Sequence, residues 1–259
     1  MEFVERFSDI KNGFRQILAD PGWVGKIVLG GCLLINPLLI IMVPFAAGGT
    51  GTFAGKVMIV ALLVNVLTFW FPLGFTFEVL RRARAGQGAQ LPDWGLELLP
   101  RYAKEGAIKL LISCSTLILP VLVWTYLAHY IFIRHLGFPV ETLGNLLPPI
   151  FLFSIPFCAV ACCRWLDGAP VLSCAFDYAE NFRLFRKAWL DYLIASAFLV
   201  GLNAVTMSLT YTIPFGMVFG LCIVDTWFGP IYAESVLAER PTGSTEREPP
   251  PLGSFHEQP

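Results

Sequence analysis

Long apolar segments alternate with short polar ones along the whole chain. An apolar segment of about 20 residues can cross a bilayer as a helix, because the hydrocarbon core is about 30 Å thick and each residue adds about 1.5 Å. The last apolar run, from Tyr192 to Ala233, contains one charge, Asp225. It is long enough for two crossings that turn near Pro214. The pattern therefore predicts six spanning helices, at about residues 27–47, 57–79, 109–133, 146–165, 191–212 and 214–236.

A mixed polar and apolar segment precedes each pair of spans. In residues 1–22 and again from Leu172 to Tyr192, apolar residues recur every three or four positions and charged residues occupy the other face. This spacing is typical of a helix that lies in the membrane interface. The second segment, residues 93–109, fits less well because Pro100 interrupts it. The expected fold is an all-α integral membrane protein of three hairpins, each preceded by an amphipathic helix on the cytoplasmic side.

Lysine and arginine indicate the orientation, since these residues are held on the cytoplasmic side of a span. With six spans and the N-terminus inside, only Lys56 and Arg134 of the 18 basic residues lie in outside loops. Adding or removing one span would move the later basic clusters to the wrong side. We therefore expect both termini to be cytoplasmic, with the membrane domain over residues 23–238. Residues 239–259, rich in Pro, Gly, Ser and Glu, are expected to form a disordered tail.

Composition agrees with the membrane class and excludes others. Hydrophobic residues make up 56% of the chain and charged residues 14%, whereas charged residues are about a quarter of a typical soluble domain. The net charge of -1 argues against a nucleic-acid partner, because a phosphate backbone requires a clustered positive excess. The lipid bilayer is the expected partner, and partner proteins or a second copy of the chain are further candidates.

Two short motifs are more specific than hydropathy. The first opens a span with Trp23 and Lys26, ahead of Gly30-Gly31, and the second runs from Gly74-Phe75 through Arg81-Arg82 and Gly86 to Leu91-Pro92-Asp93-Trp94. Together they resemble a prokaryotic multi-pass membrane family, domain of unknown function 4013. In that family a Trp-x-x-Lys start, a Gly-aromatic-to-basic exit and a Leu-Pro-acidic-Trp segment recur in this order.

The resemblance is best over residues 20–110. Phe75 stands where the family often has Tyr, so no hydroxyl role is carried over to that position. The resemblance implies a multi-pass fold in the inner or plasma membrane of a prokaryote. It implies no catalytic residue, because the family has no established chemistry.

The residues of these motifs are of the types that anchor spans at headgroup level. Asp93 is expected to cap the following helix by accepting a hydrogen bond from an exposed backbone N–H. Glu78 is expected to form local ion pairs with Arg81 and Arg82. The predicted interfacial anchors are Trp23, Lys26, Arg81, Arg82, Pro92, Asp93 and Trp94.

Asp225 is the most distinctive single residue, because an ionised carboxylate in the middle of a span costs at least about 2.5 kcal/mol. One interpretation is a proton or cation site, with Asn36, Asn65, Asn203 or Thr206 as partners within the membrane. The alternative is that Asp225 is protonated or bonded to a neighbouring helix and fixes packing. A shift of the last helix would instead bring it nearer an interface.

Cys158, Cys162 and Cys163 invite a metal interpretation, but a zinc site needs four ligands. His129 and His135 are expected at the opposite membrane face, so we predict small packing residues and no metal or cofactor. No catalytic triad, paired catalytic carboxylates or nucleotide fingerprint can be assembled on one side, so we do not expect an enzyme. The sequence favours a non-enzymatic scaffold that organises lipid or partner proteins; the alternative is a small-solute transporter or channel that uses Asp225.

Overall fold

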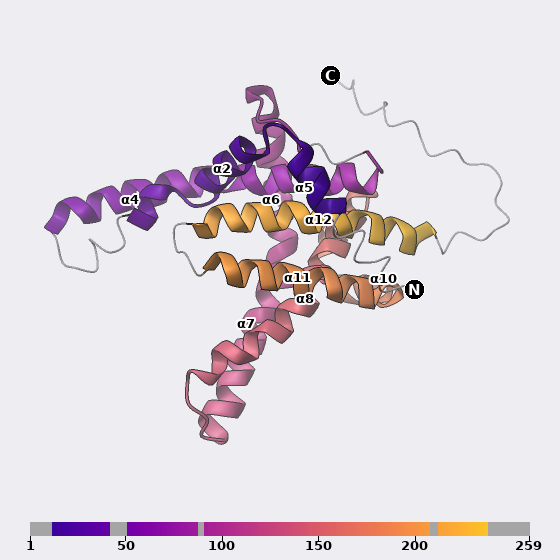
Figure 1. Cartoon of the computed structure of the whole chain (residues 1–259). Coiled ribbons are helices and arrows are strands. Elements are labelled where there is room, and N and C mark those ends of the chain that lie inside the picture. The colour runs from indigo at the N-terminus through magenta and orange to yellow at the C-terminus, as the bar shows by residue number, and fades with distance from the viewer. Residues whose placement is uncertain (1–11, 42–50, 88–90, 208–211, 238–259) are drawn as a thin grey trace.

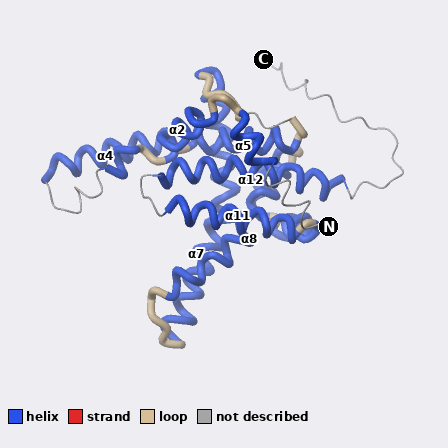
Figure 2. The backbone as a smooth tube through the Cα atoms, in the orientation of Figure 1, coloured by secondary structure: helices blue, strands red, loops and turns tan. Residues whose placement is uncertain are grey.

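The computed structural model describes residues 12–41, 51–87, 91–207 and 212–237, and every element within these ranges is a helix (Figures 1 and 2). Within these residues, five helices are long and apolar enough to cross a membrane, or six if a bent pair near the N-terminus counts as one span. The predicted all-α membrane fold is thus confirmed. The predicted tail and the first eleven residues of the predicted interfacial helix lie outside the described residues.

The first hairpin consists of α2 (Trp23–Leu34), α4 (Gly51–Thr68) and α5 (Trp70–Arg84). The predicted first span is not one continuous helix, because the chain is extended at Ile35, with φ −132° and ψ 113°, and becomes helical again from residue 37. Pro37 explains the break, since proline lacks an N–H and disfavours helical geometry in the residue before it.

The second hairpin is a helical run from residue 96 to residue 135 that is followed by α8 (Thr142–Leu166). The predicted surface segment 93–109 does not form a separate helix. Its helical part continues without a break into the predicted span 109–133. Pro100 does not interrupt it, since it lies in the first turn of its helix, where no N–H is needed. The run comprises η1 (Leu96–Leu98), α6 (Leu99–Ser113), η2 (Cys114–Ile118), α7 (Leu119–Ala128) and η3 (His129–His135).

The third hairpin pairs α11 (Trp189–Met207) with α12 (Ile213–Leu237), and two short helices, α9 (Val171–Phe176) and α10 (Tyr178–Lys187), precede it. The last helix, α12, is the centre of the molecule: it packs against α2, α5, α8 and α11 (Figure 1). More than half of its residues are buried inside the protein. The first and last parts of the chain therefore share one core.

Two glycines allow α5 and α6 to touch through their backbones. A Cβ atom on Gly74 would collide with the backbone oxygen of Tyr102, and one on Gly106 would collide with the backbone oxygen of Trp70. Small residues at such crossings let helix backbones approach closely. The resulting van der Waals contacts favour association in lipid, where no hydrophobic effect acts between helices. The contact holds α6 firmly against the end of the first hairpin.

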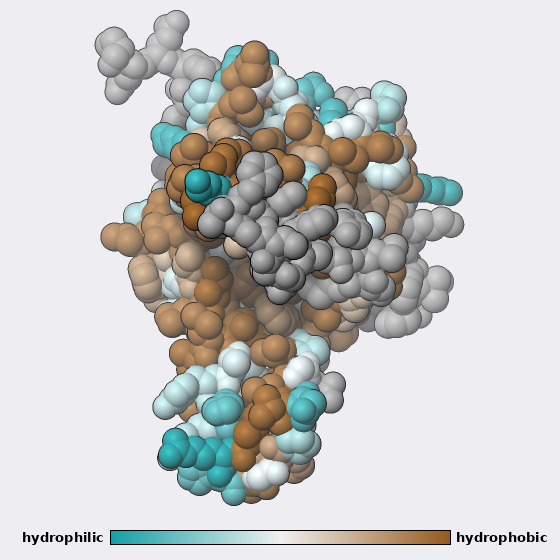
Figure 3. Space-filling model, turned by 90° about the vertical axis from the view of Figure 1, so that its left-hand side faces the viewer, coloured by the Kyte–Doolittle hydropathy of each residue, from teal (hydrophilic) through white to brown (hydrophobic). Residues whose placement is uncertain are grey.

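The outer surface is apolar where the helices project. Seen with α4 pointing toward the reader, much of the described surface is hydrophobic, and hydrophilic side chains lie at the lower end and over the upper part (Figure 3). Along α4 at least half of each of several large apolar side chains is exposed, namely Ile59, Val60, Leu62, Leu63, Val66 and Leu67. Lipid is the solvent that such a surface requires.

Candidate functional site

A buried ion pair joins α6 to α12. Lys109 Nζ lies 2.9 Å from Asp225 Oδ2, and the two side chains are only 8% and 7% exposed. The same Nζ donates a hydrogen bond of 2.9 Å to Thr76 Oγ1 of α5, and it lies 5.9 Å from the centre of the Phe77 ring. Three helices thus supply one charge-neutral polar cluster inside an apolar core.

The partner of Asp225 is therefore a lysine and none of the residues proposed from the sequence. Asp225 is bonded to a neighbouring helix, in agreement with the packing alternative. The sequence spacing around Lys109 could have identified it as the partner. Tyr102, Glu105, Lys109 and Ile112 recur at helical spacing, and in the structure all four are buried. A lysine on that face needs a buried anion, and Asp225 is the one charge in the last apolar run.

Ser113, one turn beyond Lys109, extends polar contact to α8. Its Oγ lies 3.2 Å from Cys158 Sγ, and Cys158, Cys162 and Cys163 are all buried free thiols. Among the residues that the structure describes, no three His, Cys, Asp or Glu side chains form a group that could hold a metal. The thiols fill space between helices, as small apolar residues do.

Two of the three membrane asparagines bond to each other's segment of the first hairpin. Asn65 Oδ1 accepts the backbone N–H of Asn36 at 2.5 Å, and Asn65 Nδ2 donates to the carbonyl of Leu34 at 3.3 Å. These bonds satisfy backbone groups that the break before Pro37 exposes. Asn203 lies on α11, where its Oδ1 is buried and has no hydrogen-bond partner within the described part of the chain.

The predicted anchors around Lys26 meet in one cluster, which we call the clasp and define as Asp20, Lys26, Leu91, Asp93 and Trp94. Lys26 Nζ lies 2.8 Å from Asp20 Oδ2 and 2.8 Å from Asp93 Oδ1, and donates to the carbonyl of Leu91 at 2.9 Å. The backbone N–H of Leu91 donates to Asp20 Oδ2 at 3.1 Å. The clasp therefore ties the start of α2 to the connection between α5 and α6.

Asp20 lies ahead of α2, outside the predicted spans, and is negatively charged in the clasp. Burial alone would raise its pKa, but hydrogen bonds from Lys26 and from the backbone N–H groups of Gly22 and Leu91 outweigh burial, so the pKa lies below its usual value. The carboxylate is consequently ionised at neutral pH.

Trp94 packs within the protein. Its ring stacks on Phe75 at 4.5 Å with an interplanar angle of 3°, and its Nε1 donates to the carbonyl of Lys26 at 3.0 Å. The capping role predicted for Asp93 is wrong: the following helix begins after Gly95 without a side-chain cap. Asp93 pairs with Lys26 instead, and the N-cap position is occupied by Gly95, two residues further along the chain. Pro92 is buried beside it, and Trp23 packs on Phe219 of α12, with ring centroids 5.7 Å apart.

Arg81 and Arg82 belong to a charged network between α5 and α6. Glu78 pairs with Arg81 and Arg82, which confirms the predicted local ion pairs. The sequence did not indicate the partners from α6: Arg81 Nη2 lies 2.6 Å from Glu105 Oε1, and Arg101 Nη2 lies 2.8 Å from Glu78 Oε2. The network closes the same helix crossing that Gly74 and Gly106 bring together.

The segment α9–α10 leaves several large apolar side chains exposed. Asp177 caps α10 by accepting the backbone N–H of Glu180 at 3.1 Å. A hydrogen bond from Arg183 is the main cause that lowers the pKa of Glu180 below its usual value. Leu172, Phe176 and Phe182 are each more than half exposed, although the opposite face of the segment is buried.

No family model, no curated protein and no solved structure matches the chain. The resemblance over residues 20–110 therefore stays a prediction. The structure is that of a multi-pass helical membrane protein in which buried charged residues such as Lys109 and Asp225 pair with each other.

Proposed function

We propose that the protein is a non-enzymatic membrane scaffold that organises lipid or partner proteins at the surface where its amphipathic helices lie. The observation that carries this proposal is the α9–α10 segment, which presents exposed aromatic side chains outside the spans. The paired state of Lys109 and Asp225 supports it, because these charges hold three helices together and leave the cluster neutral. We further propose that the protein lies in the inner or plasma membrane of a prokaryote, with both termini cytoplasmic.

Crosslinking in native membranes, followed by purification in mild detergent, tests the proposal. The expected result is a reproducible set of crosslinked partners, which includes copies of the chain, or a bound lipid composition that differs from that of the surrounding membrane. A chain that crosslinks to nothing and carries lipid in bulk proportions would contradict the scaffold function.

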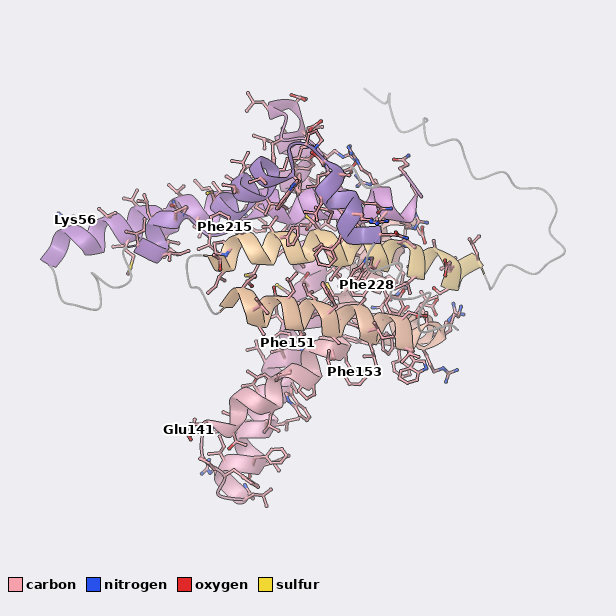
Figure 4. The ribbon with its side chains drawn as sticks, viewed as in Figure 1. Lys56, Glu141, Phe151, Phe153, Phe215 and Phe228 are labelled. Carbon is pink, nitrogen blue, oxygen red and sulfur yellow. The ribbon has the colours of Figure 1, made fainter. Side chains whose placement is uncertain are left out.

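A small-solute transporter is the second candidate, and the Lys109–Asp225 pair is the observation that favours it. Ionisable pairs within the membrane are recurrent elements of proton pathways. Proteoliposomes with an entrapped pH dye test this function under an imposed potential. Transport predicts that Asp225→Asn and Lys109→Gln both reduce proton flux, while Lys56→Gln, at the far tip of α4 (Figure 4), leaves it unchanged. Equal flux in all four proteins would remove this candidate.

A further inference from the structure

The outer part of the second hairpin projects from the rest of the protein. We call residues 119–153 the arm; they comprise α7, η3 and the first half of α8. Apart from the turns that flank it, α7 packs mainly on α8. The arm leaves the body in a different direction from α4, α11 and α12 (Figure 1), and Glu141 lies at its tip (Figure 4). Because spans of one bilayer lie within about 40° of its normal, the direction at the base decides how the arm sits in the membrane.

Burial marks the base of the arm in both of its helices. In the first helix, the buried residues of α6 and η2 end at Thr116, and Ala128 is the one described side chain of the arm that is buried. In α8, burial begins at Ser154 and continues with few interruptions to Arg164. The body therefore holds the chain up to Thr116 and again from Ser154 onward, and the arm lies outside it.

Both helices are irregular at this base. The turn η2 is a π-helix, which is wider than an α-helical turn. Pro156 lies inside α8, where it lacks the N–H that would bond the carbonyl of Leu152. The two irregularities lie at one level, since Ser113 Oγ is 3.2 Å from Cys158 Sγ. Sharp changes of helix direction occur mainly at prolines and π-turns, so the pair has the form of a hinge.

Tyr178 of α10 contacts both sides of this hinge. Its Oη lies 2.8 Å from Ser115 Oγ and donates to the carbonyl of Ser115 at 3.0 Å. Its ring lies 6.3 Å from that of Phe157, the residue after the proline, with an interplanar angle of 23°. Phe182 and Phe185 also lie beside the Phe157 ring, with centroids 6.4 and 6.2 Å away. A turn of the arm at its base therefore moves the groups that Tyr178 contacts.

The segment α9–α10 is itself fixed to the body. Asn181 is completely buried and accepts a hydrogen bond of 2.6 Å from Arg164 Nη1, in the part of α8 that the body holds. Ser115 Oγ donates to the carbonyl of Ala175 at 2.5 Å. One end of the contact is thus anchored in the body, and the other end lies at the base of the arm.

We propose that the arm pivots as a unit about η2 and Pro156, and that Tyr178 couples its direction to α10. The bond from Tyr178 to Ser115 favours the direction seen in the structure. Lipid or a partner that shifts α10 changes the balance between this direction and others, because it binds one arrangement better. The coupling rests on the scaffold function, in which α9–α10 is the contact surface, whereas the pivot itself does not.

Distances between two spin labels, measured by double electron–electron resonance, test the proposal on the full chain in phosphatidylcholine nanodiscs. The labels are attached to Val140→Cys on the arm and Val205→Cys on α11, two exposed positions. Cys32 and Cys114 are replaced by serine, since the other five cysteines are buried. We expect a distance distribution several-fold wider than that of a pair within the arm, Leu122→Cys with Val140→Cys.

Two matched pairs of variants separate the hinge from the coupling. Pro156→Ala restores a helical N–H and should narrow the distribution several-fold, whereas Pro149→Ala, within the arm, should leave it wide. Tyr178→Phe removes one hydroxyl and should lower the population of the direction seen in the structure by about 2- to 12-fold, the range expected for one hydrogen bond. Tyr126→Phe removes a hydroxyl from α7 and should leave the populations unchanged.

The possible outcomes are distinct. A single narrow distance between Val140 and Val205 in the otherwise wild-type protein would overturn the pivot and leave the scaffold function intact. A wide distribution that Pro156→Ala does not narrow would place the motion elsewhere and would also overturn it. Populations that are equal in the wild-type protein and Tyr178→Phe would overturn the coupling to α10. Loss of the scaffold function, shown by crosslinking, would leave the measured pivot standing and remove only its consequence for partners.

Discussion

Lys109 and Asp225 depend on each other, because each would be a lone charge in the protein core without its partner. Removal of one member of a buried ion pair typically costs about 3–5 kcal/mol, whereas replacement of both by apolar residues of similar size is often neutral or stabilising. Thr76 adds one hydrogen bond to the lysine, and this bond does not compensate for a lost carboxylate.

We therefore predict that Asp225→Asn lowers the free energy of unfolding by about 3–5 kcal/mol. The double variant Lys109→Met with Asp225→Leu should recover most of this loss. Denaturant unfolding of the detergent-purified proteins, followed by circular dichroism, measures both. If the double variant is as unstable as the sum of its single variants, the ion pair is not an isolated coupled unit.

Asp20 predicts a dependence of stability on pH. Its pKa in the folded protein is lower than in the unfolded chain, so its contribution is complete above the unfolded value of about 4. The contribution is lost as the pH falls through the folded value. The melting temperatures of wild-type protein and Asp20→Asn should therefore differ at pH 6 to 7 and converge on acidification. A difference that stays constant between pH 7 and pH 3 would contradict ionic pairing with Lys26.

At the scale of helices, the crossing of α5 and α6 depends on the absence of side chains at Gly74 and Gly106. We predict that Gly106→Ala destabilises the protein by about 1–3 kcal/mol, since the added methyl group would force the backbone of Trp70 away. Gly201→Ala on α11 is the matched control, because its Cβ would meet nothing within 4 Å. This control should be neutral or stabilising by up to about 1 kcal/mol. Equal effects at both glycines in thermal unfolding would refute close packing at the crossing.

The helices could be predicted from the sequence where hydropathy alone decides, as in α8 and α12, whereas the predicted span 57–79 runs from α4 into α5. The break at Ile35 was missed because an apolar run does not reveal how Asn65 satisfies the backbone groups around Pro37. Likewise, the basic residues that were assigned to the cytoplasmic side included Lys109, whose partner is 116 residues away in the chain. Local patterns indicated Glu78 with Arg81 and Arg82, whereas contacts between distant segments, such as Lys26 with Asp93, required the folded chain.

At the scale of the whole molecule, the tips of the first two hairpins lie far from the charged network. Lys56 and Glu141 lie at these tips (Figure 4). Arg81, in the last turn of α5, meets Arg101 and Glu105 of α6 instead. The three arginines in the last turn of α5 are the basis of the proposal that this end of the helix is cytoplasmic.

Orientation can be measured with single cysteines that react with a membrane-impermeant maleimide. We predict that Lys56→Cys and Glu141→Cys react from outside intact cells, and that Arg186→Cys reacts only after the cells are opened. Replacement of Cys114, which is exposed, lowers the background. If Glu141→Cys and Arg186→Cys react from the same side, the number of crossings between them is even, and the predicted topology is wrong.

The central place of α12 has a consequence for synthesis. Lys109 leaves the ribosome 116 residues before Asp225, an interval of about 6–23 s at ordinary elongation rates. During this time α6 carries an unpaired cation, and α2 and α5 lack the surface on which they pack. The nascent chain must therefore remain at the insertion machinery, or be shielded by another protein, until its last helix arrives. A ribosome that stalls before residue 225 would leave the earlier inserted helices unable to close into the native bundle.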